Sequence, residues 1–119
     1  MHELAIAQSV VDIARRHAGG RRVLKVELRI GYLRQVVPSS LAFNFELVTQ
    51  GTEVEGAELE MQAMPAAGAC RQCSTRTQLY TFPLQCGACG GFHLDIVSGE
   101  ELIVESLELE EAEIGAHAN

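Results

Sequence analysis

The chain reads Cys70-Arg-Gln-Cys73 and, beyond residues 74–85, Cys86-Gly-Ala-Cys89, and these two stretches hold all four of its cysteines. Two Cys-x2-Cys pairs at this separation can turn four thiolates inward from two tight turns, which is the tetrahedral arrangement that Zn(II) prefers. A site closed by four sulfur ligands leaves no coordination position for a substrate, so its zinc is structural and not catalytic. We therefore predict a structural zinc site at Cys70, Cys73, Cys86 and Cys89.

Glycines surround the second cysteine pair. Gly87 follows Cys86, and Gly90 and Gly91 follow Cys89. Glycine adopts positive φ without steric strain, and a tight turn around a metal ion needs that freedom for its backbone N–H groups to approach the sulfur atoms. We expect these glycines to shape the second turn in this way.

Two other interpretations of the cysteines remain open. They could form two disulfides, in any of three pairings, or a redox Cys-x-x-Cys motif. Disulfides require an oxidising compartment, whereas the first residues lack the basic segment of a signal peptide, and we expect a cytoplasmic protein. A redox motif of the thioredoxin type normally occurs singly and opens a helix, so it fits a repeated pair poorly.

Length and charge narrow the classes of function. At 119 residues the chain is one domain, or one domain with a small metal-stabilised insert, and 47% hydrophobic residues with only 5% aromatic ones predict a modest aliphatic core. The formal net charge is −7, and the segment around the cysteines has only Arg71, Arg76 and Asp95 as charged residues, so we expect no nucleic-acid binding. No apolar run approaches about eighteen residues, so we expect no membrane span.

Helical spacing of apolar residues appears twice. Residues 4–18 place Ile6, Val10 and Ile13 on one face, and the glycine at position 19 is suited to end that helix. A second helix is predicted from Pro38 to the residue before Gly51, since proline is common in the first turn of a helix.

The second helix has one predicted apolar seam. Leu41, Phe45 and Val48 form it, and Phe43 and Leu47 lie beside it. We expect both aromatic side chains to lie in the hydrophobic core and not in an aromatic binding site.

Alternation of apolar and polar residues predicts strands at 22–30 and 57–64, and residues 102–109 predict a third strand. The predicted apolar face of the first strand consists of Leu24, Val26, Leu28 and Ile30. The expected fold class is α+β, with two helices packed on a small three-stranded mixed sheet and an inserted four-cysteine, zinc-ribbon-like subdomain.

The predicted domain boundaries follow from these elements. Residues 66–95 are expected to form the zinc-binding subdomain, and residues 1–65 and 96–119 the surrounding α/β domain. Such a small core benefits from a bound metal, because the free energy of metal binding contributes to folding.

The chain begins Met1-His2-Glu3. A free α-amine, the deprotonated amide nitrogen of residue 2 and the imidazole of His2 can wrap one cation, and Ni(II) and Cu(II) both accept such a nitrogen-rich, square-planar set. Glu3 could add a carboxylate or interact with the positive end of the first helix. Because His2 is a bulky second residue, we expect Met1 to be retained with its amine. Taken alone this motif is weak, since a histidine at position 2 is usually only an exposed side chain.

The opening triplet and the two cysteine pairs, together with the order of helices and strands, resemble the HypA/HybF family of hydrogenase-maturation nickel metallochaperones. The resemblance covers nearly the whole chain. It includes three further stretches, which are Leu28-Arg-Ile-Gly31, Phe45-Glu-Leu-Val48 and Leu102-Ile-Val-Glu-Ser-Leu107.

The resemblance implies a protein that is not an enzyme, binds Ni(II) weakly at its amino terminus, and delivers it to the large subunit of a [NiFe] hydrogenase. It implies cooperation with the nickel-binding GTPase of that pathway, and it places the nickel ligands at Met1, His2 and Glu3. Some members carry an acidic residue near the start of the second helix that can approach the nickel. This chain has Pro38-Ser39 there, so that ligand is not carried over. His93, four residues beyond Cys89, could take part in zinc exchange or nickel sensing, but we expect it to be a loop histidine.

Two other functions are alternatives to this one. A zinc-ribbon adaptor that binds protein or nucleic acid would use the cysteine turns, but the acidic balance disfavours nucleic acid. A zinc-dependent hydrolase needs an open metal position, which four cysteine ligands deny. Supply of nickel to another enzyme, such as urease, stays open.

Overall fold

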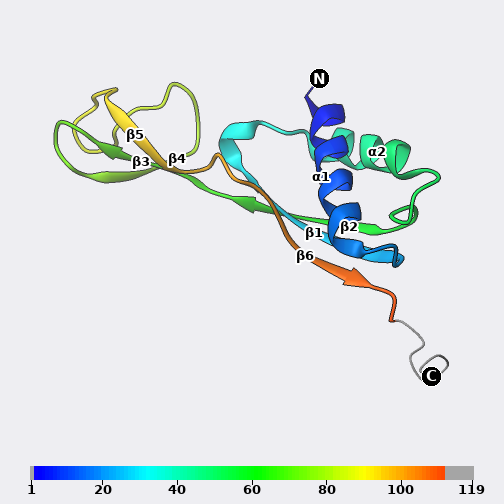
Figure 1. Cartoon of the computed structure of the whole chain (residues 1–119). Coiled ribbons are helices and arrows are strands. Elements are labelled where there is room, and N and C mark those ends of the chain that lie inside the picture. Colours follow the sequence, from blue (N-terminus) through cyan, green and yellow to red (C-terminus); the bar gives the residue numbers. More distant parts are fainter. Residues whose placement is uncertain (1, 112–119) are drawn as a thin grey trace. The chain divides into compact units, whose positions relative to one another are not determined.

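The computed structural model describes residues 2–111, and Met1 and residues 112–119 lie outside the described residues. Two α-helices, one short 3-10 helix and six strands make up the described chain (Figure 1). In chain order they are α1 (Glu3–Ala18), β1 (Val23–Gly31), η1 (Tyr32–Arg34), α2 (Pro38–Thr49), β2 (Glu58–Met64), β3 (Ala66–Cys70), β4 (Arg76–Leu79), β5 (Leu94–Ser98) and β6 (Leu102–Leu109).

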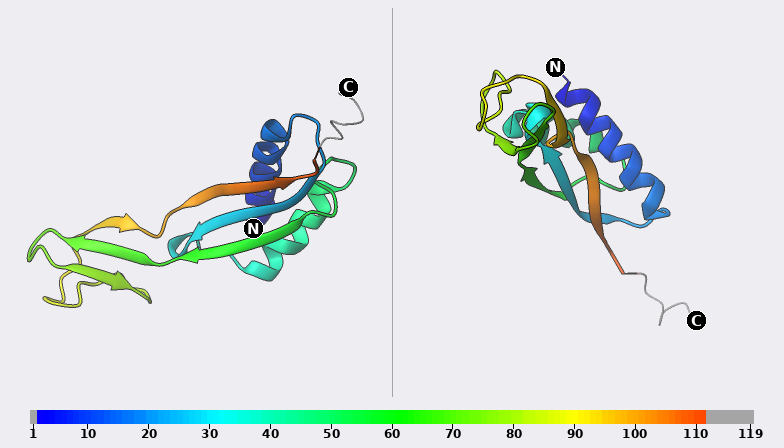
Figure 2. Two further views of the ribbon diagram at one scale, coloured as in Figure 1. Left: turned by 90° about the horizontal axis from the view of Figure 1, so that it is seen from below. Right: turned by 90° about the vertical axis from the view of Figure 1, so that its left-hand side faces the viewer.

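The strands form two three-stranded sheets, in the orders β2-β1-β6 and β4-β3-β5. In the first sheet β1 and β2 run in one direction and β6 in the other, and both helices lie on one face of this sheet (Figure 2). The predicted fold class, two helices on a small mixed sheet with an inserted four-cysteine segment, is therefore confirmed. The second sheet was not predicted.

The described chain divides into two compact units. Residues 2–28, 36–61 and 104–111 form the first, which we call the helical unit. Residues 29–35 and 62–103 form the second, which we call the cysteine unit.

Helix α1 buries one face and ends at a glycine. Ile6, Val10 and Ala14 are at most 7% exposed, which fits their spacing of four residues along one face. Gly19 follows the helix in the left-handed conformation, with φ of 61°, where glycine carries no steric penalty. The predicted bounds of this helix agree with the structure to within one residue, and Ile6 and Val10 are buried as predicted, whereas Ile13 is only half-buried.

Helix α2 is apolar on more than one face, but it buries only one. Val37 is extended and Pro38 occupies the first turn, as the sequence predicts. The buried seam is Leu41, Phe45 and Thr49, with Leu41 and Thr49 at most 2% exposed. Two expectations for this helix were wrong: Val48, predicted in the seam, is only half-buried, and Phe43, expected in the core, faces solvent.

Both side chains that lie beside the predicted seam, Phe43 and Leu47, are exposed. Phe43 is 61% exposed and Leu47 is 46% exposed. Two positions along a helix correspond to a rotation of about 200°, so Phe43 points away from the face that Leu41 and Phe45 bury. Of the two phenylalanines expected in the core, only Phe45 lies there.

Strand β1 buries Val26, Leu28 and Ile30 as predicted. Leu24, placed on the same face by the sequence pattern, is 44% exposed, whereas its neighbour Val23 is only 1% exposed. The alternation therefore fails at the first residues of the strand, where Val23 also donates its backbone N–H to the Glu53 carbonyl at 2.9 Å.

The polar face of this sheet is crossed by charged contacts. Lys25 lies 3.0 Å from a carboxylate oxygen of Glu60 on β2, and Ser106 on β6 donates to Glu27 at 2.6 Å. These contacts join side chains on all three strands, because opposite charges and hydroxyl donors on neighbouring strands lie within reach.

The second sheet is antiparallel and built from small residues. Strand β3 pairs with β4 from Ala66 opposite Leu79 to Ala69 opposite Arg76, and with β5 on its other side. At Gly68, an added Cβ atom would lie 3.3 Å from the Leu94 Cβ atom, so a larger residue would crowd the sheet. Alanine and glycine are poor strand formers, which is why the sequence pattern did not reveal β3.

Within the described residues, no helix is both long and apolar enough to cross a membrane.

Replacement of Phe45 by alanine should reduce the free energy of unfolding by about 3 kcal/mol, because it opens a cavity beneath α2. Phe43→Ala in the same helix should change it by less than about 0.5 kcal/mol, since that ring is mostly in solvent. Urea denaturation followed by circular dichroism measures both variants. Equal losses would show that the ring of Phe43 also packs in the folded protein.

Candidate metal centres

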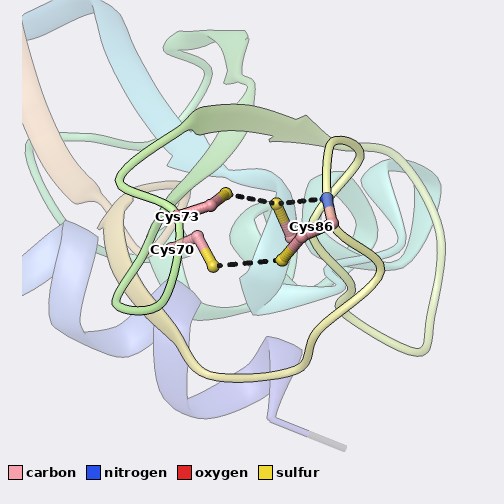
Figure 3. A group of neighbouring side chains, drawn as sticks. Cys70, Cys73 and Cys86 are labelled. Atoms are coloured by element: carbon pink, nitrogen blue, oxygen red, sulfur yellow. Dashed lines mark hydrogen bonds between the residues drawn. The ribbon is translucent and has the colours of Figure 1, made fainter.

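The four cysteines converge in the cysteine unit. Cys70 is the last residue of β3, and Cys86 and Cys89 belong to a turn before β5. The Cys70 and Cys89 sulfur atoms lie 3.7 Å apart, the Cys73 and Cys86 sulfur atoms 3.6 Å apart, and all four lie within 4.8 Å of one another. Figure 3 shows the labelled side chains of Cys70, Cys73 and Cys86 pointing toward a common centre.

These distances fit one tetrahedral metal ion. With metal–sulfur bonds of about 2.3 Å, the sulfur atoms of a tetrahedral site are about 3.8 Å apart. A disulfide would instead bring two sulfur atoms to about 2.05 Å. All four cysteines are free thiols, so the disulfide interpretation is wrong. Among the described residues, no other group of three or more His, Cys, Asp or Glu side chains lies close enough to hold an ion.

The two turns have matching backbone geometry. Ser74 donates its N–H to the Cys70 carbonyl at 2.9 Å, and Gly90 donates to the Cys86 carbonyl at 3.0 Å. Both donors have positive φ, 65° at Ser74 and 76° at Gly90. Ser74 therefore does in the first turn what Gly90 does in the second, and aligning the two cysteine pairs in sequence would have identified it.

The expectation that three glycines supply positive φ holds only for Gly90. Gly87 and Gly91 do not have positive φ. Gly87 donates its N–H to the Thr77 hydroxyl at 3.2 Å, while an added Cβ atom on Gly91 would lie 2.5 Å from a Gln72 side-chain oxygen. Gly91 thus leaves room for a side chain from the first turn.

Hydrogen bonds from backbone N–H groups help to give the cysteine thiols different pKa values. Those of Cys89 and Ala88 donate to the Cys86 sulfur at 3.5 and 3.3 Å and lower the pKa of that thiol to about 6. The N–H of Gly91 lowers the pKa of the Cys89 thiol, but the sulfur atoms around it, that of Cys70 first, raise it to about 11. Four adjacent thiolates repel one another, so a cation is needed before all four can be ionised together.

In the first cysteine turn, the backbone N–H groups of Cys73 and Gln72 lower the pKa of the Cys70 thiol.

A backbone hydrogen bond joins the first cysteine turn to the segment directly before β5. Arg71 donates its N–H to the His93 carbonyl at 2.9 Å. His93 is exposed and its side chain is not part of the cysteine cluster, which agrees with the expectation of a loop histidine.

An aromatic contact holds the loop between the cysteine pairs. The ring of Tyr32 in η1 stacks on Phe82, with centroids 6.4 Å apart, and its hydroxyl donates to the Tyr80 carbonyl. All three residues belong to the cysteine unit. The sequence does not reveal this contact, because nothing in the local pattern pairs η1 with a loop far along the chain.

The amino-terminal residues form the second predicted site. His2 precedes α1, and its side chain is 51% exposed. Glu3 is buried, at 6% exposed, and its carboxylate accepts the backbone N–H of Val37 at 3.0 Å. The His2 Nε2 atom lies 3.8 Å from the same carboxylate oxygen. Met1, the third predicted nickel residue, lies outside the described residues.

The pKa of Glu3 is lowered, first because the Val37 N–H stabilises the ionised carboxylate and also because His2 is close. Val37 is a residue that sequence reasoning missed. Its role depends on the backbone and not on its side chain, so no residue type marks it.

The fold and the cysteine cluster define a small α+β metal-binding protein. The chain belongs to the family described as "Hydrogenase/urease nickel incorporation, metallochaperone, hypA", whose family model matches residues 1–109. The resemblance noted from the sequence is confirmed.

Curated relatives carry the corresponding name. The "Hydrogenase maturation factor HypA" of Geotalea uraniireducens (strain Rf4) is 48% identical over 110 residues, covering 92% of this chain and 100% of the relative. The protein of the same name from Geobacter metallireducens is 46% identical with the same coverage.

A solved structure shares the fold. The solution structure of the Ni metallochaperone HypA from Helicobacter pylori matches with a TM-score of 0.68 over 92% of this chain and 97% of that chain. At 23% identity this likeness concerns the fold alone.

Gly90→Ala should lower the free energy of unfolding of the metal-loaded protein by about 1 kcal/mol, because alanine is strained at a φ of 76°. Gly87→Ala in the same turn is the control, since its φ is not positive and its new Cβ atom would make only an ordinary contact with Thr77. Denaturant titration measures both variants. A larger loss in Gly87→Ala would contradict the assigned turn geometry.

Proposed function

We propose that this chain binds Ni(II) at its amino terminus and delivers it for [NiFe] hydrogenase maturation, with a structural Zn(II) held by the four cysteines. The observation that carries the nickel proposal is the half-exposed imidazole of His2 at the start of α1, beside the carboxylate of Glu3. Membership of a nickel-incorporation family supports the choice of nickel.

The proposed nickel set is Met1, His2 and Glu3. The α-amine of Met1, the amide nitrogen of residue 2 and the His2 imidazole supply three nitrogen donors, which suit square-planar Ni(II). The first N–H groups of a helix have no partner within the helix, and the positive end of the helix dipole stabilises a deprotonated amide nitrogen there. Glu3 supplies a negative charge next to the bound cation.

A site of this kind suits transfer better than storage. Its ligands lie at a chain terminus and at a half-exposed side chain, so a partner's ligands can replace them one at a time. The proposed recipient of the nickel is the large subunit of a [NiFe] hydrogenase, and the proposed partner protein is the nickel-binding GTPase of the same pathway. In this account the chain itself catalyses no reaction and binds no nucleic acid.

The proposed zinc role is to hold the fold of the cysteine unit. Four thiolates in tetrahedral arrangement favour Zn(II), and no ligand position remains open for chemistry. We propose residues 66–95 as the zinc-binding subdomain and residues 1–65 and 96–119 as the nickel-binding α/β domain. We also propose a cytoplasmic location, where cysteines are kept reduced.

Nickel titration of protein with an untouched amino terminus should show one site, and His2→Ala should remove it, because the imidazole is lost. A chain extended by one residue before Met1 should also bind much more weakly, since its amine can no longer close the same chelate ring. Absorption spectroscopy of the planar nickel complex follows the binding.

The outcome that rules out this site is equal binding of one nickel by all three proteins. His17→Ala is a matched control, because that histidine lies at the other end of α1 and its ring contacts the Ile13 carbonyl at 3.0 Å. It should bind nickel as the unmodified chain does.

Cys→Ser at any of the four positions should lower zinc content and melting temperature together, because a metal ligand is lost from the core of the cysteine unit. Elemental analysis and thermal denaturation measure the two effects. A variant that contains no zinc but melts at the temperature of the unmodified protein would refute the structural role.

A further inference from the structure

We infer that Glu3 is a positioning residue for the nickel ligand His2: its carboxylate accepts the Nε2–H of the imidazole while Nδ1 binds the metal, and the Val37 backbone N–H holds the carboxylate in place. This inference rests on the proposed function and assigns a role to a residue that could otherwise be taken for a direct ligand.

The choice of ring nitrogen follows from chelate geometry. When the amide nitrogen of His2 binds a metal, its Nδ1 atom closes a six-membered ring through Cα, Cβ and Cγ. The Nε2 atom lies on the far side of the imidazole and cannot reach the same ion. A neutral imidazole that binds through Nδ1 carries its proton on Nε2, so this N–H needs an acceptor outside the metal.

The structure supplies that acceptor. The nearest carboxylate oxygen of Glu3 lies 3.8 Å from His2 Nε2, and a charge-assisted hydrogen bond forms at about 2.8 Å. Closing the difference requires a shift of about 1 Å. The imidazole is 51% exposed and free to make this shift, whereas the Glu3 side chain is only 8% exposed.

A backbone N–H group holds this carboxylate in place. The same oxygen of Glu3 accepts the Val37 N–H at 3.0 Å, and Val37 directly precedes α2. Both contacts lie within the helical unit. A buried carboxylate fixed by a backbone donor can define the direction of the imidazole, and such outer partners of metal-bound histidines also raise their basicity.

Two substitutions separate positioning from direct ligation. Glu3→Gln keeps a side-chain oxygen that can accept both the Val37 N–H and the His2 N–H, but it removes the carboxylate. Glu3→Ala removes the oxygen that would accept from both N–H groups. We expect Glu3→Gln to keep nickel affinity within a few-fold, and Glu3→Ala to weaken it by about 10–100-fold with the same planar spectrum and stoichiometry.

A spectroscopic readout distinguishes this role from mere structural support. Square-planar Ni(II) is diamagnetic, so nitrogen-15 NMR can show which His2 ring nitrogen carries the proton in the loaded protein. We expect a protonated Nε2 in the unmodified chain and in Glu3→Gln. Melting temperatures of both variants, measured without nickel, account separately for any loss of folding.

Three results overturn the inference. Equal loss of affinity in both variants, with a changed nickel spectrum, would make Glu3 a direct ligand. Unchanged affinity in a folded Glu3→Ala would show that the carboxylate does nothing for His2, and metal on Nε2 would exclude the proposed hydrogen bond. Failure of the proposed function is recognised separately, because His2→Ala would then bind nickel as the unmodified chain does.

Discussion

Mutual repulsion among four cysteine thiolates, whose sulfur atoms lie within 4.8 Å of one another, is the constraint on which the cysteine unit depends. The buried hydrophobic side chains described in that unit are few: Ile30, Ala66, Cys70, Leu79 and Cys86. Two of the five are metal-ligand candidates, so the cluster is itself a large part of the core. A cation that balances the sulfur charges therefore does what a larger apolar core does in other small domains. The backbone donors around Cys86 prepare the site for that cation, since they already stabilise a thiolate.

The helical unit differs from the cysteine unit in what stabilises it, and this difference matches the different roles proposed for nickel and zinc. Its core is aliphatic and aromatic, with Leu41 and Phe45 of α2 buried. The start of α1 combines a fixed carboxylate, Glu3, with a half-exposed imidazole, His2. A fixed acceptor and a movable ligand are compatible with metal exchange, whereas a closed four-sulfur shell is compatible with retention.

The parts of the fold predictable from sequence were those set by short-range pattern. Cysteine spacing located the metal cluster, and apolar periodicity located α1, β1 and α2. It placed Leu41 and Phe45 correctly on the buried face of α2 but did not reveal that Phe43 faces solvent, because Phe43, Phe45 and Leu47 make that helix apolar on several sides. Strand β3 was missed because its small residues are held by pairing with β4 and β5 and not by their own propensity. The contact between Glu3 and Val37 joins distant residues through a backbone N–H, which no residue pattern records.

The central claim is that the two metals use separate ligand sets, sulfur for zinc and terminal nitrogen for nickel. X-ray absorption at the zinc and nickel edges of one sample, loaded with one equivalent of each metal, tests it most directly. The account predicts a zinc shell of four sulfur atoms at about 2.3 Å and a nickel shell of nitrogen and oxygen only. Sulfur in the nickel shell, or loss of sulfur from the zinc shell when nickel is added, would contradict it.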